Sequence, residues 1–526
     1  MKKHWIVILA ICLLYGFIYT SCSNKKEQPM NVVFFLVDDL GWRDVGCYGS
    51  TFYDTPNIDK FSKEGMLFTD AYSACHVCSP TRASIMTGMY PASINLTDWL
   101  PGRREFPFQR FRNAEINQHL PYDISTLPKV LKDHGYQTAI FGKWHLGEDS
   151  ASTARQGFDL HIPDWNKGWP NKGYHSPFGL EGIEDREGAY LTDRLTDEAL
   201  KYIEVKQNEP FFLYLAHFAV HDPIQGREDL VEKYKSRLDK RGAFEGSPFI
   251  LEGNPDAKDT VPSGEINIDV REDKHDGYRV FEDGTVKIKQ HQDNVEFAAM
   301  VESMDESFGR VLAKLEELQI DDRTVVIFYA DNGGMAAANF GNPNRKISGD
   351  NLDRAFSTSN LPLRGAKGWM YEGGIRVPLI IKWPGKGLQG ATCNVPVTSP
   401  DFFPTILEML EMDATLSEGK DGKSLANLVK GEKSLDREAI FWHFPHYSNH
   451  GMQSPGAVVR SGDYKLLEYF ENNSVQLFNL KDDIGEQNDL SKKEPEKVNS
   501  MRKLLHNWQK RSGAKFMEPN PDYFTK

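Results

Sequence analysis

Four short apolar runs constrain the fold more than any other feature of this sequence. They are Asn31–Val37, Gln137–Phe141, Phe211–Ala216 and Thr324–Ala330. Runs of this length between turn-forming residues are typical of parallel strands buried on both faces. Helix patterns lie between them, at Thr126–His134 and at Asn294–Leu318, where apolar residues recur every three or four positions. The sequence therefore predicts an α/β fold with a large, mixed or mostly parallel sheet flanked by helices.

The pattern changes near residue 400. A helix is predicted at Ser399–Leu410, and from Ala439 onward the apolar runs become shorter and hairpin-like until a closing helix near Lys497–Arg511. We expect a large unit over residues 31–400 and a smaller α+β unit with an antiparallel sheet over 401–526. Residues 225–290 are polar and weakly periodic. We interpret them as an insertion, with at most a hairpin near Tyr278–Ile288.

The N-terminus has the layout of a secretion signal. Lys2 and Lys3 precede an apolar run from Trp5 to Tyr19, which is short for a membrane span of about 20 residues. Cys22 follows small residues, in an arrangement that resembles the lipobox of bacterial lipoproteins. We predict a signal peptide at residues 1–21, lipid attachment to Cys22 and a tether over 22–30. The protein would then be a lipoprotein on a bacterial membrane, facing the periplasm or the cell exterior. The alternative is an uncleaved anchor with an incidental cysteine.

Charge and cysteine content narrow the function. The 526 residues include 62 Lys and Arg against 75 Asp and Glu, which gives a net charge of −13. This acidic balance disfavours nucleic-acid binding by neutralisation of phosphates, although it is compatible with a local basic pocket. Six cysteines cannot form a disulfide scaffold in a chain of this length. We expect Cys47, Cys75 and Cys393 to be structural.

Polar side chains follow each of the four predicted strands. Asp38-Asp39, Lys143 with His145, His217 with His221, and Asp331-Asn332 come directly after the apolar runs. Ligands of open parallel sheets bind outside the carboxyl ends of the strands, so we expect these side chains to meet there. Oxygen-only ligands suit hard cations such as Ca²⁺ or Mg²⁺. Any one of these residues alone would more simply be a solvated loop residue or a helix cap.

Cys78 is a second candidate functional residue. Pro80 lies near the start of a plausible helix through Arg82–Met86, which puts Cys78 at a helix N-terminus. Two interpretations stay open from this pattern: a buried thiol and a reactive thiolate.

Several motifs together carry a family resemblance. Cys78-Ser79-Pro80-Thr81-Arg82, followed by Ala83–Gly88, resembles the first signature of the type I, formylglycine-dependent, arylsulfatase-like sulfatases, and Gly135–Gly147 resembles their second. Further matching segments are Asp38–Gly41, Thr55–Asp59, Ala330–Gly333, Lys367-Gly368, Tyr371–Pro378 and Ser461–Leu466. The match extends from about residue 31 to 490 and implies the alkaline-phosphatase-like fold.

The resemblance also implies roles. Cys78 would be converted by a maturation enzyme to formylglycine, whose hydrate attacks sulfur and is then regenerated as sulfate leaves. The implied Ca²⁺ ligands are Asp38, Asp39, Asp331 and Asn332 together with residue 78, and the implied sulfate contacts are Lys143, Lys367 and His221. Arg82 would orient the hydrate. His145 would act as the base and His221 as the general acid. The family pattern favours His221 over its neighbour His217.

The sequence says less about the substrate than about the reaction. Loop residues that could line a pocket are Trp99, Arg103, Arg104, Trp165, Trp169, Tyr174, His443, His446 and His450, although each alone is more simply a packing or surface residue. A membrane-tethered bacterial member most resembles the glycan-degrading sulfatases. We therefore predict an exo-acting carbohydrate sulfatase, with galactose or N-acetylgalactosamine sulfates favoured. The alternatives are a formylglycine-dependent phosphodiester or phosphonate hydrolase and a non-enzymatic glycan-binding lipoprotein.

Overall fold

The structure is a computed structural model. It describes residues 28–105, 107, 109–147, 152–242, 244–253, 264–265, 286–339, 355–448, 450 and 453–523. The predicted signal peptide and Cys22 lie outside these residues, so the lipoprotein assignment stays a prediction. None of the described helices is both long enough and apolar enough to span a membrane.

An eight-stranded mixed sheet forms the centre of the molecule. Its strand order is β13-β2-β12-β11-β1-β7-β5-β6. The bounds are β1 Asn31–Val37, β2 Met66–Phe68, β5 Gln137–Gly142, β6 Leu160–Ile162, β7 Phe211–Ala216, β11 Thr324–Ala330, β12 Leu379–Lys382 and β13 Ala391–Cys393. The strands from β11 to β6 are parallel, whereas β12 runs antiparallel to β11 and β2. All four apolar runs are thus confirmed as neighbouring parallel strands.

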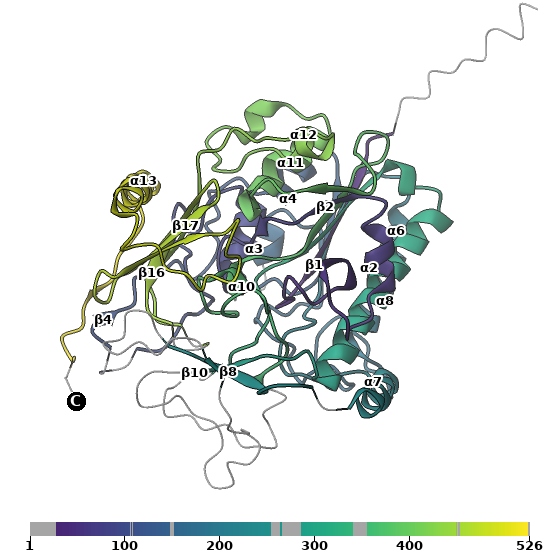
Figure 1. Ribbon diagram of the computed structural model, residues 1–526. Coiled ribbons are helices and arrows are strands. Elements are labelled where there is room, and N and C mark those ends of the chain that lie inside the picture. Colours follow the sequence, from purple (N-terminus) through teal and green to yellow (C-terminus); the bar gives the residue numbers. More distant parts are fainter. Residues whose placement is uncertain are drawn as a thin grey trace, which may run out of the picture.

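Helices cover both faces of this sheet (Figure 1), which explains why β1 is apolar at every position after Asn31. Phe35 packs edge-on against Phe308 of α8 (Val295–Glu317), at 5.0 Å between ring centroids. The preceding residue, Phe34, packs against Phe402 of α11 (Phe402–Met409) on the opposite face, also at 5.0 Å. The helices α2 (Pro56–Phe61), α6 (Leu191–Lys206) and α7 (Glu228–Arg241) lie with α8 (Val295–Glu317), and α3 (Cys78–Thr87) and α4 (Leu127–Asp133) lie with α11 (Phe402–Met409).

The helix boundaries follow the sequence signals closely. Asn294 caps α8, and its side-chain oxygen accepts a hydrogen bond from the backbone N–H of Phe297 at 3.1 Å. In the predicted insertion, however, α7 was not foreseen. Its buried stripe consists only of Leu230, Val231 and Tyr234 among charged residues, which makes the helical period weak.

The predicted hairpin near Tyr278–Ile288 is described only from residue 286. There β10 (Val286–Lys289) pairs antiparallel with the distant β8 (Phe249–Glu252), and β9 (Gly264–Glu265) completes this small sheet. Among the described residues, two further strand pairs are β3 (Ala71–Tyr72) with β14 (Val397–Thr398) and β4 (Phe111–Arg112) with β19 (Glu518–Pro519). The other short helices there are α5 (Ser152–Arg155), α10 (Glu372–Ile375) and α12 (Ala426–Val429). Short 3₁₀ turns lie at Gly46–Tyr48, Asp321–Arg323, Ser399–Asp401 and Ala414–Ser417.

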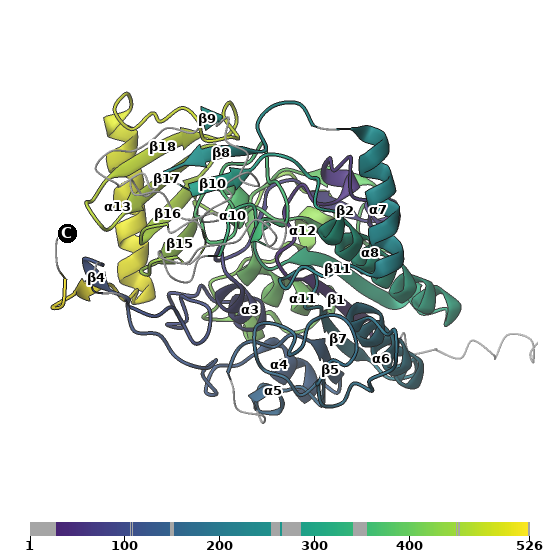
Figure 2. The ribbon, with the colours of Figure 1, turned by 90° about the horizontal axis from the view of Figure 1, so that it is seen from below.

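A separate antiparallel sheet forms the C-terminal part, as predicted. It consists of β15 (Ile440–Phe444), β16 (Gly456–Ser461), β17 (Tyr464–Tyr469) and β18 (Val475–Asn479), in that order. The closing helix α13 (Pro495–Ser512) lies against it, at the far end of the molecule from α6, α7 and α8 (Figure 2).

The C-terminal part packs in a second hydrophobic core, which it shares with segments of the large unit such as those of Tyr90 and Trp369. Trp508 of α13 stacks on Phe441 at 4.8 Å within the C-terminal core. In contrast, α11 and α12 pack in the core of the large sheet. Residues 402–429 therefore pack with the large sheet although they follow residue 400, and from Ala439 onward the buried apolar residues belong to the second core.

Candidate active site

Three acidic residues meet at the carboxyl end of the large sheet. In the parallel pairing of β1 with β11, Val37 lies opposite Ala330, so Asp38 and Asp331 leave the sheet side by side. The backbone N–H of Asp39 donates to Oδ1 of Asp331 at 3.2 Å. All three carboxylates are almost completely buried. The strand ends therefore meet as the sequence predicts.

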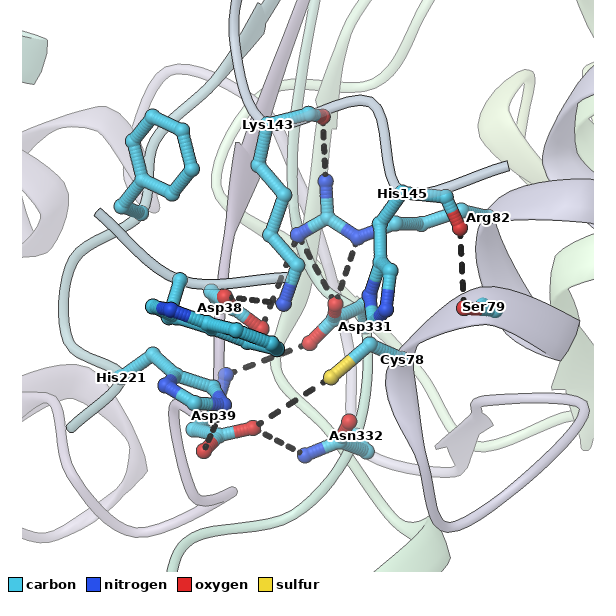
Figure 3. Close-up of polar contacts among 12 residues, drawn as sticks. Asp38, Asp39, Cys78, Ser79, Arg82, Lys143, His145, His221, Asp331 and Asn332 are labelled. Carbon is cyan, nitrogen blue, oxygen red and sulfur yellow. Dashed lines mark hydrogen bonds and ion pairs between the residues drawn. The ribbon is translucent and has the colours of Figure 1, made fainter. Parts of the chain in front are cut away.

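Three cationic side chains match these carboxylates. Lys143 Nζ lies 2.6 Å from Asp38 Oδ2, and Lys367 Nζ lies 2.6 Å from Asp39 Oδ2. Arg82 donates to Asp331 Oδ2 through Nε at 2.9 Å, and its Nη2 lies 2.8 Å from the same oxygen in an ion pair. Figure 3 shows Arg82 and Lys143 reaching the acidic group from beyond Asp38 and Asp331. These pairs allow acidic side chains to be buried so close together.

The pKa values of the acids differ with their partners. Burial acts to raise the pKa of Asp38, but Lys143 and the other nearby cations outweigh it and hold that pKa far below its ordinary value. Burial, reinforced by the charge of Asp38, raises the pKa of Asp331.

The donor set fits a hard cation. Oxygen or sulfur atoms of Asp38, Asp39, Asp331 and Cys78 all lie within 4.8 Å of one another. Oδ1 of Asp38 and Oδ1 of Asn332 are buried with no hydrogen-bond partner in the described part of the chain, while Nδ2 of Asn332 donates to Asp39 at 2.8 Å. Two buried oxygens without hydrogen-bond partners, beside further carboxylates, form the kind of site that suits Ca²⁺.

Cys78 begins the helix α3 beside this acidic group. Its side chain points toward Asp39 (Figure 3), with 4.0 Å between Sγ and Oδ1. The preceding residue, Val77, is extended, so residue 78 is the first of the helix and lies near unpaired backbone N–H groups. Ser79 donates its hydroxyl to the carbonyl oxygen of His145 at 2.9 Å, which fixes the start of α3 against the segment after β5.

The surroundings of His145 favour the neutral imidazole, whereas those of His221 favour the protonated one. Nε2 of His145 donates to the carbonyl oxygen of Leu100 at 2.8 Å, and its buried Nδ1 has no partner among the described residues. Burial, and then the charge of Lys143, lowers the pKa of His145 well below its ordinary value. This imidazole is therefore neutral, with Nδ1 free to accept a proton.

His221 is cationic by the same reasoning. Its Nδ1 lies 2.8 Å from Oδ1 of Asp222, and its Nε2 lies 3.7 Å from Oδ2 of Asp39. Burial and Lys367 act to lower the pKa of His221, but the carboxylates of Asp39 and Asp222 outweigh them and hold it well above its ordinary value. His217, in contrast, is fully buried and bonds to Ser307 of α8 at 2.9 Å, away from the acidic group.

A cavity of about 360 Å³ opens beside these residues. Cys78, His145, His221 and Lys367 lie on its wall, whereas Lys143 and Arg82 are buried behind the acids and do not line it. The other lining residues are Val77, Trp99, Gly168, Trp169, Asp222, Pro223, Asn339 and His450. Its size suits one small ligand.

Of the loop residues proposed to line a pocket, Trp99, Trp169 and His450 do so. Most of the others have structural contacts: Tyr174 donates to the carbonyl oxygens of Phe218 and His221, Trp165 to that of Trp169, Arg103 to that of Ser448, His443 bonds to Lys515 and His446 to Thr97. Asp222 and Asn339 line the cavity but were missed. Asp222 follows His221 directly and could have been inferred, whereas Asn339 carries no local signal.

Comparison with known proteins agrees with the family resemblance of the sequence motifs. The sulfatase family model matches residues 30–412, and the model of the N-sulphoglucosamine sulphohydrolase C-terminal region matches residues 366–511. A sulfatase of Formosa agariphila is 29% identical, with 94% of this chain and 90% of that protein covered. The N-acetylgalactosamine-6-O-sulfatase of Bacteroides thetaiotaomicron is 26% identical, with 92% and 96% covered. The solved complex of Ps i-CgsB with k-i-k-neocarrahexaose is 27% identical, covers 92% of this chain and 93% of that one, and superposes with a TM-score of 0.67.

The mixed sheet with its strand-end acids, paired cations and Cys78 defines a hydrolase of the alkaline-phosphatase-like fold. The chain belongs to the sulfatase family, and it is a type I sulfatase that hydrolyses sulfuric esters. The family resemblance inferred from its motifs is confirmed.

Proposed function

We propose that this sulfatase removes sulfate from a terminal sugar of a glycan, with galactose and N-acetylgalactosamine sulfates as the favoured substrates. One observation carries the proposal: Cys78, His221 and Lys367 line a cavity of about 360 Å³, and Trp99 and Trp169 line the same cavity. Indole faces stack on sugar rings, and a cavity this small holds a single ring at a chain end. The Bacteroides relative named for N-acetylgalactosamine 6-O-sulfate supports the choice of sugar.

We propose formylglycine, made from Cys78 by a maturation enzyme, and Ca²⁺ as the reactive group and the metal. The hydrated aldehyde would supply the oxygen nucleophile at position 78, and the cation, held by Asp38, Asp39, Asp331 and Asn332, would draw charge from the sulfate oxygens. Overall, the S–O bond to the sugar breaks, water provides the new oxygen on sulfur, and a proton reaches the sugar oxygen.

The remaining groups of the site would act through charge and proton position. Lys367, on the cavity wall, would bind a sulfate oxygen. His221 would give the proton on Nε2 to the leaving sugar oxygen, because its carboxylate neighbours keep it protonated. His145 would accept a proton at its free Nδ1 as sulfate leaves. Lys143 and Arg82 would hold Asp38 and Asp331 in place from behind.

The test is sulfate release by matured protein from a panel of position-defined sulfated monosaccharides. We expect turnover of at least one galactose or N-acetylgalactosamine sulfate and none by Cys78→Ala. Mass spectrometry of the peptide Ala71–Arg82 from the native host should show the aldehyde; an intact thiol there would falsify the formylglycine assignment. Faster turnover of the phosphate ester of the same sugar would favour the phosphoester alternative, and absence of any turnover would favour the glycan-binding one.

We further propose, from the sequence alone, that Cys22 anchors the protein to a bacterial membrane. Metabolic labelling with a fatty-acid analogue should mark the wild-type protein but not Cys22→Ser. Equal labelling of both would contradict the anchor.

A further inference from the structure

One wall of the cavity comes from the C-terminal part of the chain. The segment between β15 and β16 crosses to the large unit, where His450 forms an isolated antiparallel bridge with Asn339. The crossing is held by side chains of the large unit. Arg103 donates to the carbonyl oxygen of Ser448 at 2.9 Å, and Thr97 bonds to Nε2 of His446 at 2.8 Å. His450 is therefore fixed in position before any ligand binds.

The side chain of His450 lacks the partner that its neighbours have. It is 6% exposed, lines the cavity, and its buried Nε2 has no hydrogen-bond partner within the described residues. In contrast, His443 bonds through Nε2 to the carbonyl oxygen of Lys515 at 2.7 Å, and His446 bonds to Thr97. A buried polar nitrogen without a hydrogen-bond partner destabilises the folded state, so a ligand that supplies the partner is favoured. Among the described residues of this segment, the packing leaves Nε2 of His450 available to a ligand.

The charge around His450 restricts what that partner can be. Burial, and then the cation of Lys367, lowers the pKa of His450 well below its ordinary value, so its imidazole is neutral. A neutral imidazole offers one donor and one acceptor but no charge for a sulfate or a carboxylate. A sugar hydroxyl, which donates and accepts, matches it.

The position of His450 places this contact near the ester. A Cβ atom added at Gly368 would lie 2.4 Å from Cβ of His450, so the histidine packs directly over the residue that follows Lys367. Lys367 and His221, the residues proposed to hold the sulfate end, line the same cavity. A group bound by His450 would therefore belong to the sulfated ring itself.

We propose that His450 is a specificity-determining residue that hydrogen-bonds through Nε2 to a free hydroxyl group of the sulfated sugar ring. This inference rests on the proposed saccharide substrate. It follows that the enzyme selects rings on which this hydroxyl is neither sulfated nor otherwise substituted, because a substituted oxygen loses its proton and a second sulfate adds a charge that neutral His450 does not balance.

The test compares two substrates that differ in their hydroxyl groups. One is the most rapidly hydrolysed sulfated monosaccharide of the panel described above, and the other is 4-methylumbelliferyl sulfate, which has no sugar hydroxyls. For His450→Ala we expect kcat/KM on the sugar to fall about 10- to 100-fold, the range for a lost hydrogen bond to a buried polar group. On the aryl sulfate it should stay within about threefold. His450→Gln, whose amide can reach toward the position of Nε2, should recover part of the loss.

A matched control is His506→Ala, because His506 is half exposed on α13 and outside the cavity. It should change neither rate, and the melting temperatures of all variants should agree. Equal losses of His450→Ala on both substrates would overturn the inference in favour of a role in folding or catalysis. An unchanged kcat/KM of His450→Ala on the sugar would overturn the proposed His450 contact but not the proposed substrate. A wild-type enzyme that cleaves the aryl sulfate but no sugar sulfate would overturn both this contact and the proposed substrate.

Discussion

Lys367 Nζ lies 2.6 Å from Oδ2 of Asp39, although the two residues come from opposite ends of the large unit. The pair is buried, yet Lys367 also lines the cavity. Burial acts to lower the pKa of Lys367, but the charge of Asp39 outweighs it and raises that pKa above its ordinary value. The ammonium group is therefore positively charged at every working pH, at the place where an anionic sulfate would enter.

Replacement of this lysine should impair catalysis more than folding. We expect Lys367→Ala to lower kcat/KM on a sulfated sugar and on an aryl sulfate about 100- to 1,000-fold, the usual range for a lost electrostatic contact in an active site. Lys367→Arg should retain part of the activity, because it keeps the charge in a different shape. Steady-state kinetics measure both, with the exposed Lys503→Ala as control. A sulfatase that tolerates Lys367→Ala would contradict the sulfate contact.

Addition of a cation should stabilise the protein. Asp38 Oδ1 and Asn332 Oδ1 lack hydrogen-bond partners among the described residues, so both are available to a bound cation. We expect EDTA to lower the melting temperature and the activity, and Ca²⁺ to restore both. At about 100 times its dissociation constant, a bound ligand contributes about 2.7 kcal/mol to the free energy of unfolding. Asp331→Ala should abolish the calcium-dependent shift, as differential scanning calorimetry can measure. Identical melting curves with and without calcium would argue against the metal.

The parts of the site that lie at strand ends could be predicted from the sequence. Asp38 and Asp331 follow apolar runs directly, and the geometry of parallel strands brings such residues together. Cys78 could be placed at a helix start because Pro80 follows it. These features depend on neighbours in the chain and on one general property of sheets.

The rest depends on packing between distant segments. The bridge of Asn339 with His450 and the bond from Arg103 to Ser448 join residues with no local pattern in common. Most of the aromatic and histidine candidates proved to be packing residues for the same reason, since exposure is decided by partners elsewhere in the chain. The helix α7 was missed because tertiary contact with α8 stabilises a stripe too narrow to recognise.

A buried acid should give the stability of the protein a distinctive pH dependence. Asp44 accepts hydrogen bonds from the backbone N–H of Gly41 at 2.8 Å and from Gln292 at 2.9 Å. Burial raises its pKa from 3.8 to about 7. The folded protein therefore binds this proton more tightly than the unfolded chain. The resulting stability is complete below pH 3.8 and is lost as the pH rises through about 7.

We expect Asp44→Asn to be less stable than wild type at pH 5, because the amide replaces an acceptor, and to lose less stability between pH 5 and pH 8. Between pH 5 and pH 8, the gap in free energy of unfolding between wild type and Asp44→Asn should shrink by up to a few kcal/mol. Urea titrations at a series of pH values measure it, with the exposed Asp322→Asn as control. Parallel pH curves for wild type and Asp44→Asn would show that Asp44 does not titrate in this window.

The C-terminal sheet should depend on one buried lysine for its attachment. Lys465 of β17 is fully buried, and its Nζ lies 3.0 Å from Glu372 of α10 and 2.8 Å from Glu486. Lys465→Met preserves most of the volume but leaves two buried carboxylates without this cation. We expect it to lower the free energy of unfolding by about 3–5 kcal/mol, the usual cost of removing one partner of a buried ion pair. Lys503→Met, on the exposed face of α13, should change the free energy of unfolding by less than about 0.5 kcal/mol.

A second substitution separates charge from packing. Because burial raises the pKa of Glu486 to about 7, a neutral side chain is tolerated there, and Lys465→Met with Glu486→Gln should recover part of the loss. Urea denaturation of the three variants decides the matter: if the double variant is no more stable than Lys465→Met, the loss comes from packing and not from the unpaired charge.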